Sequence, residues 1–137
     1  MRIKYSMDEM KFISIFENVT KASFKDCITT DQGLLFIVPP EMMGRAIGKE
    51  GSTIKQLERI LRKRVKVVAF DPDLPKFIEN LVYPAKIKSI RQEDGVVTIQ
   101  AQDLKTRGQL IGRGASTLRG FEADIKRYFP IKELRVA

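Results

Sequence analysis

The sequence contains an internal repeat, and this repeat constrains the fold more than any other feature of the chain. Residues 44–54 match residues 108–118 at a constant offset of 64 positions, so that Gly48 matches Gly112 and Thr53 matches Thr117. The chain has 137 residues, which is only slightly more than twice this offset. A repeat of this length indicates two copies of one small module rather than one continuous domain.

The first half of the chain has the residue pattern of a small α+β module. We expect a helix over 7–18, strands over 23–29 and 34–38 around a turn at Asp31–Gly33, a short helix ending at Ile47, a helix after the glycine loop, and a strand over 65–69. Ile54, Leu57 and Leu61 recur at the spacing of one helix face. The order of these elements follows from periodicity and turn residues.

The second half repeats this order. We expect a helix over 76–82, strands over 85–91 and 96–101, a helix to Ile111 with Asp103 as its N-cap, a helix after the second loop, and a strand over 131–136. The Asp94–Gly95 pair between two apolar runs is typical of a hairpin turn. The predicted domains are therefore 1–70 and 77–137, joined by a short proline-rich linker over 71–76.

The glycine loops are the candidate functional sites. Glycine permits a tight turn between two helices, and its bare backbone lets a sugar-phosphate chain approach closely. The helix that follows each loop presents free N–H groups and the positive end of its dipole there. Lys49 and Arg113 add a positive charge at equivalent positions. The alternative is a tight helix turn with an exposed basic residue and no ligand.

Composition favours a polyanionic partner and argues against catalysis. The formal net charge is +8, and residues 49–66 contain seven basic and two acidic side chains. The chain has no histidine, so it lacks the commonest general base and metal ligand. We therefore expect no enzymatic activity, no metal and no cofactor.

The expected location is cytoplasmic. The single Cys27 cannot form an intramolecular disulfide, which is typical of a reducing compartment. The N-terminal residues 1–5 have no continuous apolar stretch, and no apolar run is long enough to span a bilayer. We expect neither a secretory signal nor a membrane-spanning helix.

The segments 47–54 and 111–118 resemble the signature loops of KH domains. The order of elements is that of the type II KH fold, in which a three-stranded mixed sheet packs on helices. Two such modules in one short chain resemble the archaeal members of the NusA family of transcription termination and antitermination factors. The resemblance implies a protein that binds single-stranded RNA in nascent transcripts, with RNA polymerase as a second partner. A monomer is the default expectation.

The resemblance places the RNA-binding role on both loops. The charge pattern adds the helices that follow them, whose basic residues either track an RNA backbone or form a solvated helix face. The loop residues are Gly48, Lys49, Glu50 and Gly51 in the first module, and Gly112, Arg113, Gly114 and Ala115 in the second. The basic helix residues are Lys55, Arg59 and Arg62 in the first module and Arg119 in the second, where Glu122 and Asp124 reduce the positive charge.

Two residues depart from the expected loop pattern. Ala115 stands where the motif expects a glycine, which suits a position that already has helical backbone angles. Glu50 places a negative charge where phosphate contact is expected. The apolar residues beside the loops, Ile47, Ile54, Ile111 and Leu118, are expected in the core rather than against RNA.

Two other functions are compatible with this sequence. One is an adaptor that uses its KH folds to dock on a protein, and the other is a factor associated with ribosomes or RNA processing. RNA binding should weaken steeply with salt, whereas apolar protein docking should not.

Overall fold

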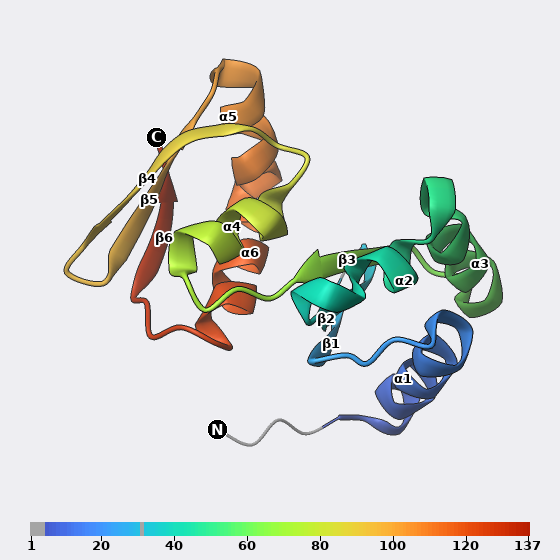
Figure 1. Cartoon of the computed structure of the whole chain (residues 1–137). Helices are drawn as coiled ribbons and strands as arrows, with labels where there is room; N and C mark the ends of the chain where they lie inside the picture. Colours follow the sequence, from blue (N-terminus) through green and yellow to red (C-terminus); the bar gives the residue numbers. More distant parts are fainter. Residues whose placement is uncertain (1–4, 31) are drawn as a thin grey trace. The chain divides into compact units, whose positions relative to one another are not determined.

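The computed structural model describes residues 5–30 and 32–137, and the chain divides into two compact units between Asp71 and Pro72 (Figure 1). Each unit contains its own three-stranded sheet. The expectations for residues 1–4 and for a turn at Asp31 lie outside the described residues. No helix in the described ranges is long and apolar enough to cross a membrane.

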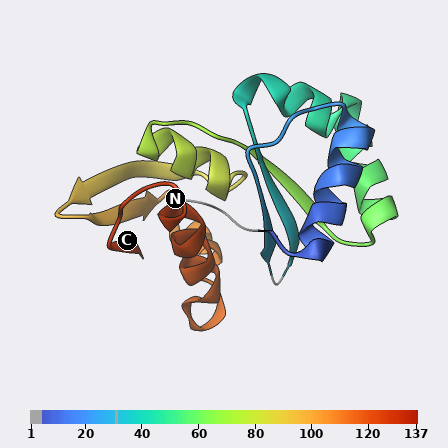
Figure 2. The ribbon, with the colours of Figure 1, turned by 90° about the horizontal axis from the view of Figure 1, so that it is seen from below.

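The first unit is a mixed sheet covered by helices on one face. Its elements are α1 (Met7–Thr20), β1 (Asp26–Thr30), β2 (Gly33–Val38), η1 (Pro40–Met42), α2 (Met43–Ile47), η2 (Lys49–Gly51), α3 (Ser52–Leu61) and β3 (Val65–Ala69). Strand β2 lies in the centre, antiparallel to β1 and parallel to β3. Figure 2 shows α1 and α3 on the same side of this sheet, where their apolar faces form one core with alternate strand residues.

Helix α1 illustrates how local sequence sets these elements. Ser6 and Glu9 form a reciprocal capping box, with the Glu9 N–H donating to Ser6 Oγ at 3.1 Å and the Ser6 N–H to Glu9 Oε1 at 3.0 Å. The helix ends at Lys21, which has left-handed backbone angles. Between these ends, Phe16 is fully buried and stacks on Phe36 of β2 at a centroid distance of 4.2 Å. The helix is thereby fixed to the centre of the sheet.

The second unit repeats the first. Its elements are α4 (Leu74–Val82), β4 (Ile87–Glu93), β5 (Val96–Ala101), α5 (Leu104–Ile111), η3 (Arg113–Ala115), α6 (Ser116–Lys126) and β6 (Glu133–Val136). The central strand β5 is antiparallel to β4 and parallel to β6. The largest fully buried side chains of this unit include Phe77, Ile99, Leu110, Ile125 and Leu134.

The predicted fold class and the order of the elements are confirmed, including the N-cap at Asp103, whose side chain accepts a hydrogen bond from the Thr106 N–H at 2.7 Å. Several boundaries differ from the prediction. Helix α4 begins at Leu74, within the expected linker, because Asp73 precedes it and Pro75 suits a first helical turn. Strand β4 continues to Glu93, since the turn at Asp94–Gly95 is tight enough to keep Glu93 paired with Val96.

Candidate nucleic-acid interface

The two glycine loops have nearly identical backbone geometry. The short helix before each loop ends at a glycine with positive φ, where Gly48 has φ 76° and ψ 171° and Gly112 has φ 73° and ψ 178°. The Gly48 N–H donates to the Gly44 carbonyl and the Gly112 N–H to the Gly108 carbonyl, each at 2.9 Å. These angles are essentially restricted to glycine. The repeat in sequence is therefore also a repeat in conformation.

A threonine on the following helix fills the space beside each of these glycines. A Cβ on Gly48 would overlap the Thr53 side chain and backbone N, and a Cβ on Gly112 would overlap the same atoms of Thr117. Both threonines belong to the sequence repeat, but the repeat alone predicts no role for them. The structure indicates that each threonine packs against the bare backbone and holds the loop against the start of its helix.

Each loop then contains two successive residues in the left-handed region. They are Glu50 and Gly51 in the first loop, with φ 55° and 74°, and Gly114 and Ala115 in the second, with φ 60° and 62°. Ala115 therefore does not have the helical angles that would suit alanine. Each loop has one glycine at these two positions, but the glycine occupies the second position in one loop and the first in the other.

The loops present cations and open helix ends to solvent. Lys49 and Arg113 are exposed, and helices α3 and α6 begin directly after the loops at Ser52 and Ser116. Within the described residues, no side chain caps the N-terminus of either helix by a hydrogen bond. The Ser52 and Ser116 N–H groups donate to the carbonyl groups of Lys49 and Arg113, so each helix offers an anion the positive end of its dipole rather than its first N–H group.

Helix α3 extends the positive surface of the first loop. Lys55 and Arg59 on α3 are exposed, as is Arg62, the left-handed residue that ends the helix, while Leu57 is fully buried in the core. None of the three basic residues forms an ion pair with a residue in 5–30 or 32–137. Their charges are therefore available to phosphate groups.

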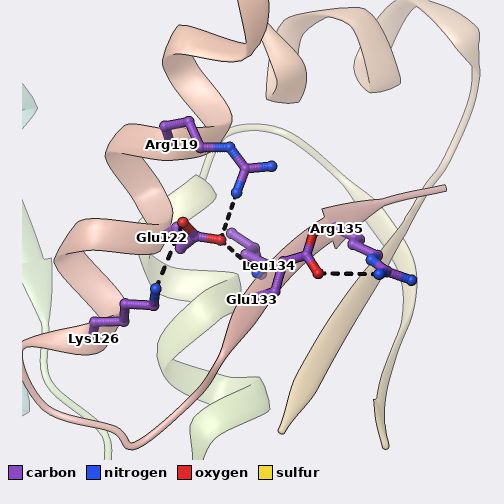
Figure 3. Close-up of polar contacts among 6 residues, drawn as sticks. All are labelled: Arg119, Glu122, Lys126, Glu133, Leu134 and Arg135. Carbon is purple, nitrogen blue, oxygen red and sulfur yellow. Dashed lines mark hydrogen bonds and ion pairs between the residues drawn. The ribbon is translucent and has the colours of Figure 1, made fainter.

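The corresponding residue of the second module, Arg119, is already paired. Its Nη1 lies 2.7 Å from Glu122 Oε2, and Lys126 Nζ lies 3.8 Å from Glu122 Oε1 (Figure 3). Arg113 lies on the loop and Arg119 on the helix, so the two sequence-predicted cations of this module have different environments. The charge of Arg119 is shared with a neighbouring acid on the same helix.

One contact is repeated in both units and was missed by sequence analysis. Glu58 Oε2 accepts a hydrogen bond from the Val65 N–H at 3.0 Å, and Glu122 Oε2 accepts one from the Leu134 N–H at 2.8 Å. Each glutamate thereby joins the helix after the loop to the last strand. The signal was present, because Glu58 and Glu122 are separated by the repeat offset.

The environment of Glu122 lowers its pKa. Partial burial acts to raise this pKa, but the hydrogen bonds from the Leu134 N–H and Arg119, with the charges of Arg119 and Lys126, outweigh it. The carboxylate is therefore ionised at neutral pH and holds its partners as an anion.

The apolar residues beside the loops are less buried than expected. Leu118 is buried, with 6% of its surface exposed, whereas Ile47, Ile54 and Ile111 are half-buried. The predicted core position is confirmed for Leu118, whereas the three isoleucines are only partly buried. They place apolar surface next to the polar loops, which is the combination that a nucleotide with a charged backbone and an apolar base requires.

Comparisons with known proteins agree with this arrangement. A sequence profile of the KH domain matches residues 12–71. A relative from Halococcus morrhuae is 31% identical over 139 residues and covers 100% of both chains. A relative from Methanocaldococcus jannaschii is 27% identical, and the match covers 98% of this chain and 75% of the relative. A relative from Halobacterium salinarum is 26% identical, and the match covers 99% of both chains. Each is named probable transcription termination protein NusA.

A solved structure is similar along nearly the whole chain. The crystal structure of APE1850 matches with a TM-score of 0.75 and 28% sequence identity, covering 97% of this chain and 100% of that one. The profile covers one unit, whereas these longer similarities extend over both.

Proposed function

The chain belongs to the KH-domain family of NusA-like RNA-binding proteins, and we propose that it acts in transcription termination or antitermination by binding single-stranded RNA in nascent transcripts. The observation that carries this proposal is the pair of loops with matching backbone geometry, each with an exposed cation and followed by a helix that has no side-chain cap. The role is that of a non-catalytic binding factor.

In the first module, we propose that the RNA backbone follows the loop from Gly48 to Gly51. The positive end of the α3 dipole and the Lys49 ammonium group face the phosphates, since KH loops clamp about four nucleotides of backbone. The basic face of α3 continues this path, and the half-buried Ile47 and Ile54 offer apolar surface to the bases. The binding residues on this face are Lys55, Arg59 and Arg62.

In the second module, we propose the same role for Gly112, Arg113, Gly114 and Ala115. The contribution of this module is smaller, because the methyl group of Ala115 narrows the approach to the backbone and Arg119 is paired with Glu122. Binding of one transcript by both loops would make the second contact intramolecular and raise the affinity.

Docking on a protein such as RNA polymerase is the second candidate function. A cavity of about 400 Å³ in the second unit is lined by apolar side chains that include Leu74, Val97 and Ile131, with Glu93 and Asp94 among its residues. Met7 and Met10 on α1 are 79% and 57% exposed. Acidic and apolar surface of this kind suits a protein better than RNA.

The deciding experiment is a titration of a fluorescent single-stranded RNA of about twelve nucleotides, long enough for two four-nucleotide contacts. Wild type, Lys49→Asp and Arg113→Asp are compared at two salt concentrations, with folding checked by circular dichroism. We expect salt-sensitive binding that is lost in Lys49→Asp and weakened in Arg113→Asp. Folded wild type that binds no mixed-sequence RNA at low salt would overturn the proposal and favour protein docking.

A further inference from the structure

The helices after the two loops carry the same pattern of charges. Lys55, Glu58 and Arg62 match Arg119, Glu122 and Lys126 at the repeat offset. In each unit a cation lies three residues before the glutamate and another lies four residues after it. All three residues of the second trio lie on one face of α6, whereas Arg62 is the left-handed residue that ends α3 after Leu61. Both trios have the same formal net charge. Any difference between them therefore comes from geometry and from the exchange of lysine and arginine between the matched positions.

The geometry differs at the glutamate. Glu122 is paired with both cations of its trio, and its side chain is 12% exposed while those of Arg119 and Lys126 are 49% and 44% exposed (Figure 3). Glu58 also accepts a strand N–H, but Lys55 and Arg62 form no ion pair in the described chain.

Glu122 is held in position and cannot follow its partners into solvent. The hydrogen bond from the Leu134 N–H anchors the same oxygen, Oε2, that accepts from Arg119. An anchored carboxylate loses little side-chain freedom when it pairs, so its ion pair is stronger than one between two mobile side chains. A phosphate that approaches Arg119 must therefore compete with a carboxylate that is already in place.

We infer that Glu122 is a specificity-determining counter-ion that withholds Arg119 and Lys126 from RNA and makes the first module the dominant binding site. This inference rests on the proposed RNA-binding function. The effect depends on a single carboxylate. Its replacement by an amide should leave the cations of the second module without an ion pair, like those of the first module. The amide of the Glu122→Gln variant would still offer an oxygen to the Leu134 N–H, so this substitution retains the strand contact.

A double-mutant cycle on the full chain tests the inference with the same fluorescent RNA. Arg119→Ala should weaken binding by less than about twofold in the wild-type background, because this charge is already engaged. In the Glu122→Gln background it should weaken binding about fivefold or more, a difference of at least about 0.5 kcal/mol. Glu122→Gln alone should strengthen binding. The matched control is Lys55→Ala, which should have the same effect in the wild-type and Glu58→Gln backgrounds.

The slope of affinity against salt is a second measurement that leaves Glu122 unchanged. Lys55→Ala should reduce this slope by about 1, as expected for a lost phosphate contact, and Arg119→Ala should leave it unchanged. An equal effect of Arg119→Ala in both backgrounds, or an equal loss of slope in Lys55→Ala and Arg119→Ala, would overturn the inference while wild-type RNA binding stands. Absence of wild-type binding would instead overturn the proposed function.

Discussion

At the scale of single residues, the two loops place their strained positions differently. Ala115 has φ 62°, and its neighbour Gly114 has φ 60°. The left-handed conformation costs a residue with a Cβ roughly 1–2 kcal/mol, and glycine avoids this cost. We expect Ala115→Gly to raise the free energy of unfolding by about 0.5–1 kcal/mol, after the greater chain entropy of glycine is subtracted.

Denaturant unfolding of Ala115→Gly and Gly114→Ala checks this expectation. The second variant adds a Cβ at the equivalent angle and should be destabilised by about 1 kcal/mol, although no atom lies within 4 Å of the added group. Opposite shifts of the two midpoints support the strained loop. A stability of Ala115→Gly equal to or lower than that of wild type would contradict it.

The first glycine of each loop is constrained by space as well as by φ. In Gly48→Ala the new methyl group would overlap Thr53 at a φ of 76°, so we expect a loss of about 2–4 kcal/mol in stability. Gly44→Ala is the matched control, because it lies in α2 with no atom within 4 Å of an added Cβ. It should be neutral or stabilising by up to about 1 kcal/mol. Thermal unfolding followed by circular dichroism compares the two, and similar losses in both variants would count against steric exclusion at Gly48.

The sequence alone identified the key glycines of the loops but not the contacts around them. The spacing of the repeat identified Gly48 and Gly112 without any knowledge of angles. It could not assign the left-handed angles of Glu50 and Ala115, because a residue with a Cβ carries no sequence signal for this conformation. Nor could it indicate that Thr53 fills the space beside Gly48, since that contact depends on how α3 leaves the loop.

At the scale of elements, one glutamate joins helix to strand in each unit. Glu122 has a lowered pKa relative to its ordinary value of 4.5, so the folded state binds a proton less readily than the unfolded state does. Its stabilisation is therefore present above about pH 4.5 and is lost as the pH falls through the lower, folded-state value. We expect the stability of wild type to fall in this acidic range more steeply than that of Glu122→Gln.

Chemical unfolding between pH 3 and pH 7 measures this difference in slope, over the range in which glutamate titrates. The matched control is Glu133→Gln, since Glu133 forms an ion pair with Arg135 at 3.1 Å but is more exposed, at 38% of its side-chain surface. Its replacement should change the stability little, because exposed ion pairs contribute about 0–1 kcal/mol. Parallel curves for wild type and Glu122→Gln would contradict the role of this carboxylate.

The order of the elements was predictable, whereas their exact ends and the ion pairs on them were less so. Apolar periodicity and the Asp94–Gly95 turn gave the order of helices and strands in both units. Strand starts were wrong by a few residues, as at β1, which begins at Asp26 rather than at residue 23. The ion pair of Glu122 was not predictable, because the equivalent trio in α3 has the same spacing and no such pair.

At the scale of the whole molecule, we expect affinity for RNA to depend on the covalent link between the two modules. A flexible insertion of about ten Gly and Ser residues between Asp71 and Pro72 would lower the effective concentration of one loop near RNA bound to the other. We expect affinity for RNA of about twelve nucleotides to fall several-fold. Affinity for RNA of about four nucleotides should not change, because that length fills one KH loop.

The effect of this insertion on affinity should depend on Glu122, the counter-ion in α6. In the wild type, where Glu122 withholds Arg119, the insertion should cost only this several-fold factor. In Glu122→Gln the second contact is stronger, and the same insertion should then weaken binding by a larger factor on the long RNA only. Fluorescence titration of the four combinations measures this coupling. An insertion that weakens short and long RNA equally would indicate a damaged module, and one that weakens neither would indicate that a transcript contacts a single loop.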